Sequence, residues 1–68
     1  MKLTAKTKHD VKIGDVVQFS YGDAYVVTGI IDTGRCVSYA LQDIKTKRTI
    51  YGMPSSECYG AEIIKQEV

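Results

Sequence analysis

One histidine, His9, and two cysteines, Cys36 and Cys58, are the residues of this sequence best suited to covalent or metal chemistry. A catalytic histidine needs a nucleophile and an orienting group beside it, but His9 stands in a polar stretch and is expected to be solvated. Structural zinc sites usually have closely paired ligands, and the sequence has no Cys-x-x-Cys pair. We therefore expect no metal, no cofactor and free thiols.

Aspartate is the commonest candidate for acid–base chemistry, and each aspartate falls at or near an expected turn or strand end. Aspartate side chains stabilise turns by hydrogen bonding to nearby backbone groups. A structural role therefore explains them without catalysis, and we expect a protein that is not an enzyme. These residues are Asp10, Asp15, Asp23, Asp32 and Asp43.

Basic residues gather in two places, near the N-terminus and in mid-chain. They could contact phosphates while Tyr51 stacks a base, although termini and hairpin tips are also commonly charged for solubility. The net charge of only +1, from nine basic and eight acidic residues, argues against a dedicated nucleic-acid binder. Nucleic-acid binding is thus our alternative hypothesis, and its residues are Lys2, Lys6, Lys8, Lys45, Lys47, Arg48 and Tyr51.

Tyrosine is abundant, with five residues in a chain of 68. Its large, fairly rigid side chain is favoured at protein-binding surfaces. Tyr39 is expected in the core. Tyr21, Tyr25 and Tyr51 would form a protein-binding patch if they lie on one face. Our leading hypothesis is a non-catalytic module that binds, and regulates, a protein partner.

The elements that must position these residues are short strands. Residues 1–10 are polar and predict a flexible basic arm, and residues 11–68 predict one domain. Paired β-branched residues and turn signals indicate strands at 16–19, 24–31, 35–43, 49–53 and 61–65. Alternation in the third strand predicts Val37, Tyr39 and Leu41 facing the core, and Gly29 predicts a bulge.

Pro54 is expected to end the fourth strand because proline cannot donate to a sheet ladder. Ser55 to Glu57 resembles a helix start, and Gly60 follows too closely for a long helix. A single 3₁₀ turn before the last strand is the prediction. The alternative is a C-terminal helix from Ser56 to Gln66.

The segments Ile13–Val17, Tyr25–Ile30 and Met53–Glu57 resemble the first strand, the second strand and the 3₁₀ turn of SH3-like small barrels. This group includes KOW-type and Tudor-type domains and short bacterial and phage domains. The resemblance implies an all-β, five-stranded SH3-like barrel, typical of a bacterial or phage accessory protein. The absence of tryptophan disfavours recognition of polyproline segments.

Composition agrees with a small globular domain, with 44% hydrophobic and 25% charged residues. The first residues contain no apolar run that could serve as a secretory signal, and no stretch is long and apolar enough to predict a transmembrane helix. We expect a cytoplasmic protein that is a monomer or a homodimer formed through edge strands.

Overall fold

The chain folds almost entirely into strands, as the computed structural model shows for residues 1–66. The predicted all-β class is confirmed, and the end of the predicted domain at residue 68 lies outside the described residues. The elements are β1 (Val16–Gln18), β2 (Ala24–Asp32), β3 (Val37–Asp43), β4 (Thr49–Pro54), the 3₁₀ helix η1 (Ser55–Cys58) and β5 (Glu62–Ile64).

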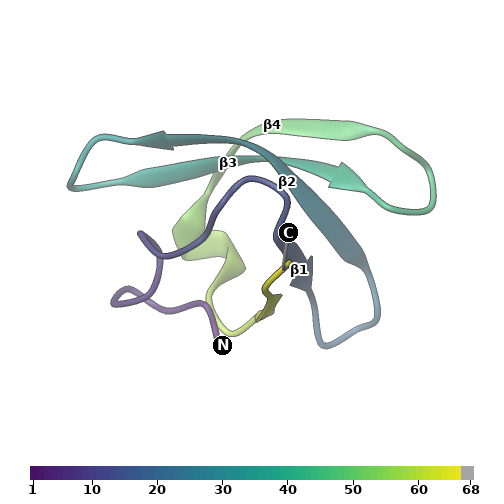
Figure 1. Ribbon diagram of the computed structural model, residues 1–68, viewed down its shortest axis with the longest axis horizontal. Coiled ribbons are helices and arrows are strands. Elements are labelled where there is room, and N and C mark those ends of the chain that lie inside the picture. Colours follow the sequence, from purple (N-terminus) through teal and green to yellow (C-terminus); the bar gives the residue numbers. More distant parts are fainter. Residues whose placement is uncertain (67–68) are drawn as a thin grey trace.

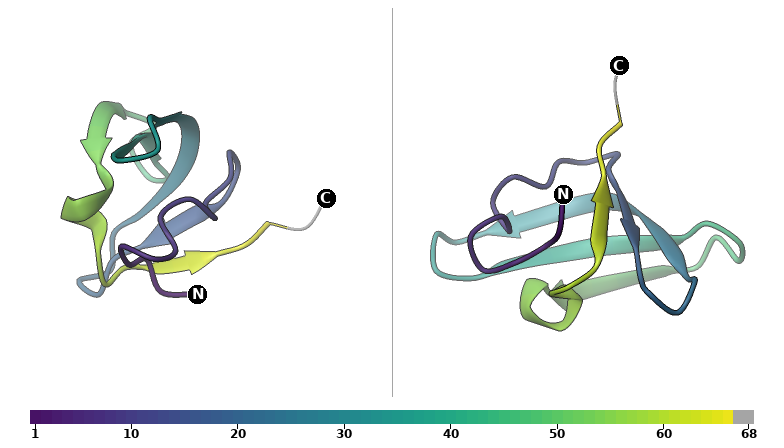
Figure 2. Two further views of the ribbon diagram at one scale, coloured as in Figure 1. Left: turned by 90° about the vertical axis from the view of Figure 1, so that its left-hand side faces the viewer. Right: turned by 90° about the horizontal axis from the view of Figure 1, so that it is seen from below.

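The five strands form one antiparallel sheet in the order β4-β3-β2-β1-β5. The sheet curls so that β2, β3 and β4 lie on one side of the core and β1 and β5 on the other (Figures 1 and 2). Within residues 1–66, β4 and β5 do not pair. The sheet is therefore open at its two edge strands, β4 and β5, and the closed barrel that we expected is not confirmed.

Strand β3 buries the three residues predicted from its alternation. Val37, Tyr39 and Leu41 are at most 2% exposed. The predicted bulge is confirmed in β2, where the register with β3 shifts between Val27 and Gly29. A Cβ atom at residue 29 would lie 3.3 Å from the Cβ of Ala40, so glycine permits the close approach of β2 and β3.

The C-terminal segment forms a single 3₁₀ turn and a strand, as predicted, and the alternative helix over residues 56–66 is not formed. Gly60 has a φ of +93°, which a glycine tolerates and an α-helix excludes. Ile63 on β5 is buried. No helix among the described residues has the length and apolar character needed to cross a membrane.

Residues 1–10 contribute to the packed structure, which the predicted arm did not anticipate. Leu3 has no exposed surface. Its backbone N–H donates to Ala61 and its carbonyl accepts from Gly60, both at 2.8 Å, and Lys2 forms an isolated bridge with Glu62. Packing thus begins before residue 11, because one apolar residue inside the polar stretch reaches the core.

The core lies inside the curl of the sheet. Its residues come from the N-terminal segment, from strands on both sides of the curl and from η1. Its buried hydrophobic residues are Leu3, Val11, Val17, Val27, Val37, Tyr39, Leu41, Cys58, Ala61 and Ile63. Tyr39 is the largest of the fully buried side chains, so its predicted core position is confirmed.

Candidate functional site

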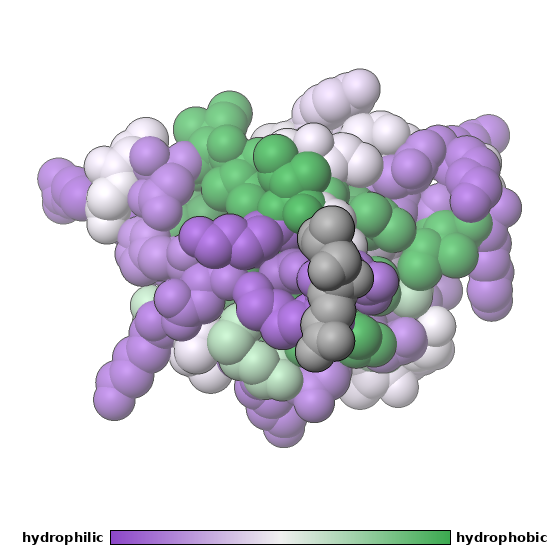
Figure 3. All heavy atoms as spheres, viewed as in Figure 1, coloured by the Kyte–Doolittle hydropathy of each residue, from purple (hydrophilic) through white to green (hydrophobic). Residues whose placement is uncertain are grey.

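The outer face of β2, β3 and β4 contains a shallow hollow beside Tyr51, which we call the outer-face hollow. Its volume is about 350 Å³. Tyr51 and Ile31 stand at it with 81% and 67% of their surface exposed. Figure 3 shows apolar side chains gathered over this part of the molecule. The lining residues are Thr28, Gly29, Ile30, Ile31, Ser38, Ala40, Tyr51 and Gly52.

Small residues on three adjacent strands create the hollow. Gly29, Ala40 and Gly52 present little or no side chain between the larger residues that flank them. The register of β3 with β4 shifts between Tyr39 and Leu41, so an extra residue of β4 lies opposite Ala40. Tyr51 follows Ile50, which pairs with the inward-facing Leu41, and therefore projects from the outer face.

The outer-face hollow offers a ligand mainly apolar contacts, together with a few hydroxyl groups. None of the described residues that line it is charged. The Thr28 hydroxyl already donates to the Ala40 carbonyl at 3.2 Å. Tyrosine is among the residues that are enriched at protein–protein interfaces.

Tyr21 and Tyr25 lie together elsewhere, on either side of Phe19 in the β1–β2 hairpin. The rings of Phe19 and Tyr21 stack with centroids 5.3 Å apart, and Tyr25 meets Phe19 edge-on at 5.7 Å. Tyr21 is 70% exposed, in agreement with its predicted surface position. Tyr25 packs against the core, where burial and then the charge of Asp23 raise its pKa.

The three tyrosines of the predicted patch therefore do not share a face. Tyr25 projects inward with Val27, two residues further along β2, while Tyr51 projects from the outer side of the same sheet. The condition for a single patch of these three tyrosines is therefore not met. Alternation orders the residues within one strand, but it does not relate the faces of β2 and β4 to each other.

The basic residues of the alternative hypothesis fall into separate regions. Lys45, Lys47 and Arg48 are exposed in the β3–β4 connection, where the Asp43 carboxylate accepts the N–H of Lys45. Lys8 lies at the opposite end of β3, against the β2–β3 connection, where its Nζ donates to the Arg35 carbonyl at 3.0 Å. Strand β3 has seven residues and so separates the two groups by roughly 20 Å.

Lys2 and Lys6 do not join either group into one surface. Lys2 is held beside β5 through its bridge with Glu62, and Lys6 is exposed in the turn that follows. The predicted nucleic-acid residues thus surround the molecule rather than form a single basic face.

The residues that could do covalent or metal chemistry are dispersed. Cys36 is exposed and Cys58 is buried, and both are free thiols; burial raises the pKa of Cys58. His9 lies with its Nδ1 2.7 Å from a carboxylate oxygen of Asp32. Within residues 1–66, no three His, Cys, Asp or Glu side chains lie close enough to hold a metal ion.

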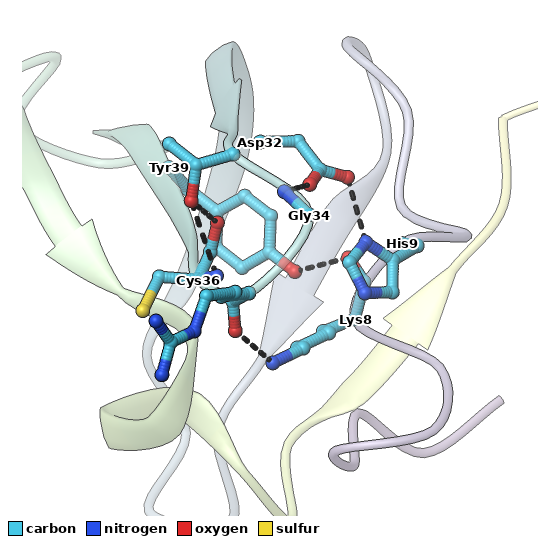
Figure 4. Close-up of polar contacts among 8 residues, drawn as sticks. Lys8, His9, Asp32, Gly34, Cys36 and Tyr39 are labelled. Carbon is cyan, nitrogen blue, oxygen red and sulfur yellow. Dashed lines mark hydrogen bonds and ion pairs between the residues drawn. The ribbon is translucent and has the colours of Figure 1, made fainter.

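The connection between β2 and β3 fixes the end of the N-terminal segment (Figure 4). The Tyr39 hydroxyl donates to the Lys8 carbonyl at 2.8 Å, next to the pair formed by His9 and Asp32. The hydrogen bond from His9, with that from the N–H of Gly34, lowers the pKa of Asp32. Asp32, Asp43 and Asp15 all accept backbone N–H groups in turns, as the sequence predicted for aspartates.

We expect Tyr39 to ionise far later than a free tyrosine, because burial raises its pKa to about 12 from an ordinary value of 10.0. The folded state therefore holds this proton more tightly than the unfolded state, and the stability gained is present below pH 10 and lost as the pH rises through 12. Absorbance titration at 295 nm measures the ionisation. If an ionisation step near pH 12 persists in Tyr39→Phe, that step belongs to another tyrosine.

Several residues of the outer-face hollow were missed by the sequence analysis. Ile30 and Ile31 are adjacent in a strand, so one of them had to face away from the core, and this was the available signal for Ile31. No sequence signal indicated that Gly29, Ala40 and Gly52 would lie side by side, because that depends on the register of three strands.

Comparisons with protein-family models, with curated proteins and with solved structures find no match to the chain.

Proposed function

We propose that this chain is a non-catalytic binding module that contacts a protein partner through the outer-face hollow, with Tyr51 as the principal contact. The observation that carries the proposal is the 81% exposure of Tyr51 beside an uncharged, mainly apolar surface. Contiguous exposed apolar patches on small proteins often mark binding sites.

The shape of the surface favours an extended apolar segment of the partner. The outer-face hollow spans three adjacent strands, and its glycine and alanine residues allow another backbone to approach closely. Its volume of about 350 Å³ is at the lower limit of ligand pockets, which hold roughly 300–1,000 Å³. One or two apolar side chains of the partner would fill it.

We also propose that the fold is an SH3-like small barrel. The strand order β4-β3-β2-β1-β5 and the 3₁₀ turn before β5 support this. Such folds host many unrelated functions, so the proposed function rests on the surface and not on the fold. Nucleic-acid binding is less well supported because the basic residues are separated and none lines the outer-face hollow.

Replacing Tyr51 with alanine is expected to weaken capture of the partner by roughly thirtyfold, the loss of about 2 kcal/mol that is typical of a hot-spot tyrosine. Affinity purification of the tagged chain from its native host, with and without nuclease, identifies the partner, and titration with that purified partner measures the affinity. The thermal unfolding midpoint should hardly change, since Tyr51 contributes little buried surface.

Tyr21→Ala is the matched control, because Tyr21 is also exposed but lies in the β1–β2 hairpin. It should retain binding. Equal losses from the two variants would contradict the outer-face hollow as the binding surface, and capture that disappears after nuclease treatment would support the nucleic-acid alternative.

A further inference from the structure

A second hollow lies where the β2–β3 connection, the start of β3, the end of β4, η1 and the N-terminal segment meet. Its volume is about 120 Å³. Its lining residues are Lys8, Arg35, Cys36, Val37, Ser38, Pro54, Ser55, Ser56 and Tyr59. We propose that this site, which we call the basic hollow, binds a tetrahedral oxyanion, namely a phosphate or sulfate group.

The chemical composition of the lining carries the proposal. Two residues, Lys8 and Arg35, are cationic, and four others carry hydroxyl groups. None of these described lining residues is a carboxylate. Lysine, arginine, serine and tyrosine side chains are the groups that contact phosphate oxygens in proteins.

Neither Lys8 nor Arg35 takes part in an ion pair within the described residues. Asp32 is near enough to feel the charge of Lys8, but its two oxygens already accept from His9 and from the N–H of Gly34. Glu57 follows Ser56 along η1 and does not line the basic hollow. An oxyanion bound in the basic hollow would give these two side chains a counter-charge.

Lys8 is held in place before any ligand binds. It is half-buried, its carbonyl accepts from the buried Tyr39, and its Nζ donates to the Arg35 carbonyl (Figure 4). An ammonium group has three N–H donors, so two remain for a ligand. Fixing the cation in advance reduces the entropy that binding must overcome.

The basic hollow is small. Its volume of about 120 Å³ is well below the roughly 300–1,000 Å³ of pockets that hold drug-sized ligands, and this agrees with a ligand of a few heavy atoms. The hollow is open to solvent at Arg35 and Ser56, which are exposed, so a larger molecule could present a phosphate group to it.

The test is to titrate the isotope-labelled chain separately with inorganic phosphate, with sulfate and with a simple phosphate monoester. Binding is monitored through the amide chemical shifts at constant ionic strength. Shifts should concentrate at residues 35–38 and 54–59. Lys8→Gln and Arg35→Gln should each weaken phosphate binding by roughly 10- to 150-fold, since charge-assisted hydrogen bonds contribute ~1.5–3 kcal/mol. If the monoester binds as tightly as free phosphate, the natural ligand is a phosphate group on a larger molecule. If free phosphate binds more tightly, the natural ligand is the free ion.

Lys45→Gln and Lys47→Gln are the matched controls, because they remove the same charge from the opposite end of β3. They should change the affinity less than twofold. Chloride alone giving the same shifts, or control variants losing as much affinity as Lys8→Gln, would overturn the proposal. Tyr51 does not line the basic hollow, so Tyr51→Ala should bind phosphate normally whether or not the proposed function is correct.

Discussion

Leu3→Ala is expected to lower the free energy of unfolding by about 2–5 kcal/mol, the cost of truncating a fully buried leucine. Leu3 has no exposed surface and belongs to the core. A domain of this size has a total stability of only roughly 3–10 kcal/mol, so the variant should lose a large part of it. Chemical denaturation followed by circular dichroism measures the change.

Ile13→Ala is the control for Leu3→Ala, because Ile13 is also a branched aliphatic residue but is 67% exposed. Its effect should stay within about 0.5 kcal/mol, as is usual for surface substitutions. If Leu3→Ala changed the free energy of unfolding as little as Ile13→Ala, the packing of Leu3 would be refuted. Residues 1–10 would then be the detached arm that their polar composition suggests.

Asp15→Asn is expected to lower the free energy of unfolding by on the order of 2–3 kcal/mol, the contribution of hydrogen bonds to a charged group. The Asp15 side chain is only 5% exposed and lies 2.8 Å from the Nζ of Lys65. The same carboxylate accepts the backbone N–H of Lys12 at 2.9 Å and that of Gln66 at 3.4 Å. It thus joins the turn before β1 to the segment that follows β5.

The loss of stability caused by Asp15→Asn should depend on pH. Burial alone would raise the pKa of Asp15, but the hydrogen bonds from Lys65, Lys12 and Gln66 outweigh it and lower the pKa below its ordinary value of 3.8. The folded state then binds the proton less tightly than the unfolded state. The stabilisation is present above pH 3.8 and is lost as the pH falls through the lower folded-state pKa.

The difference in unfolding free energy between wild type and Asp15→Asn should therefore be largest near neutral pH and shrink below pH 4. Asp10→Asn is a suitable control, because Asp10 is exposed and its side chain makes no hydrogen bond among residues 1–66. A difference that stays constant from pH 7 to pH 2.5 would show that ionisation of Asp15 contributes nothing to stability.

Residue order by itself determined most of the local structure. The inward alternation of Val37, Tyr39 and Leu41, the bulge at Gly29 and the short turn after Pro54 were all predicted, because each depends on the preferences of neighbouring residues. A surface position was also predicted for Tyr51, which is 81% exposed.

Tertiary structure alone decided which residues meet. The burial of Leu3, the separation of Tyr51 from Tyr25, and the meeting of Lys8 with Arg35 and Ser56 all join segments that are distant in the chain. Such contacts depend on strand register and on the curl of the sheet, and a shift of one residue exchanges its two faces. Alternation within one strand does not show which residues of the neighbouring strands lie beside it, so the sequence predicted the strands but not the surfaces they form together.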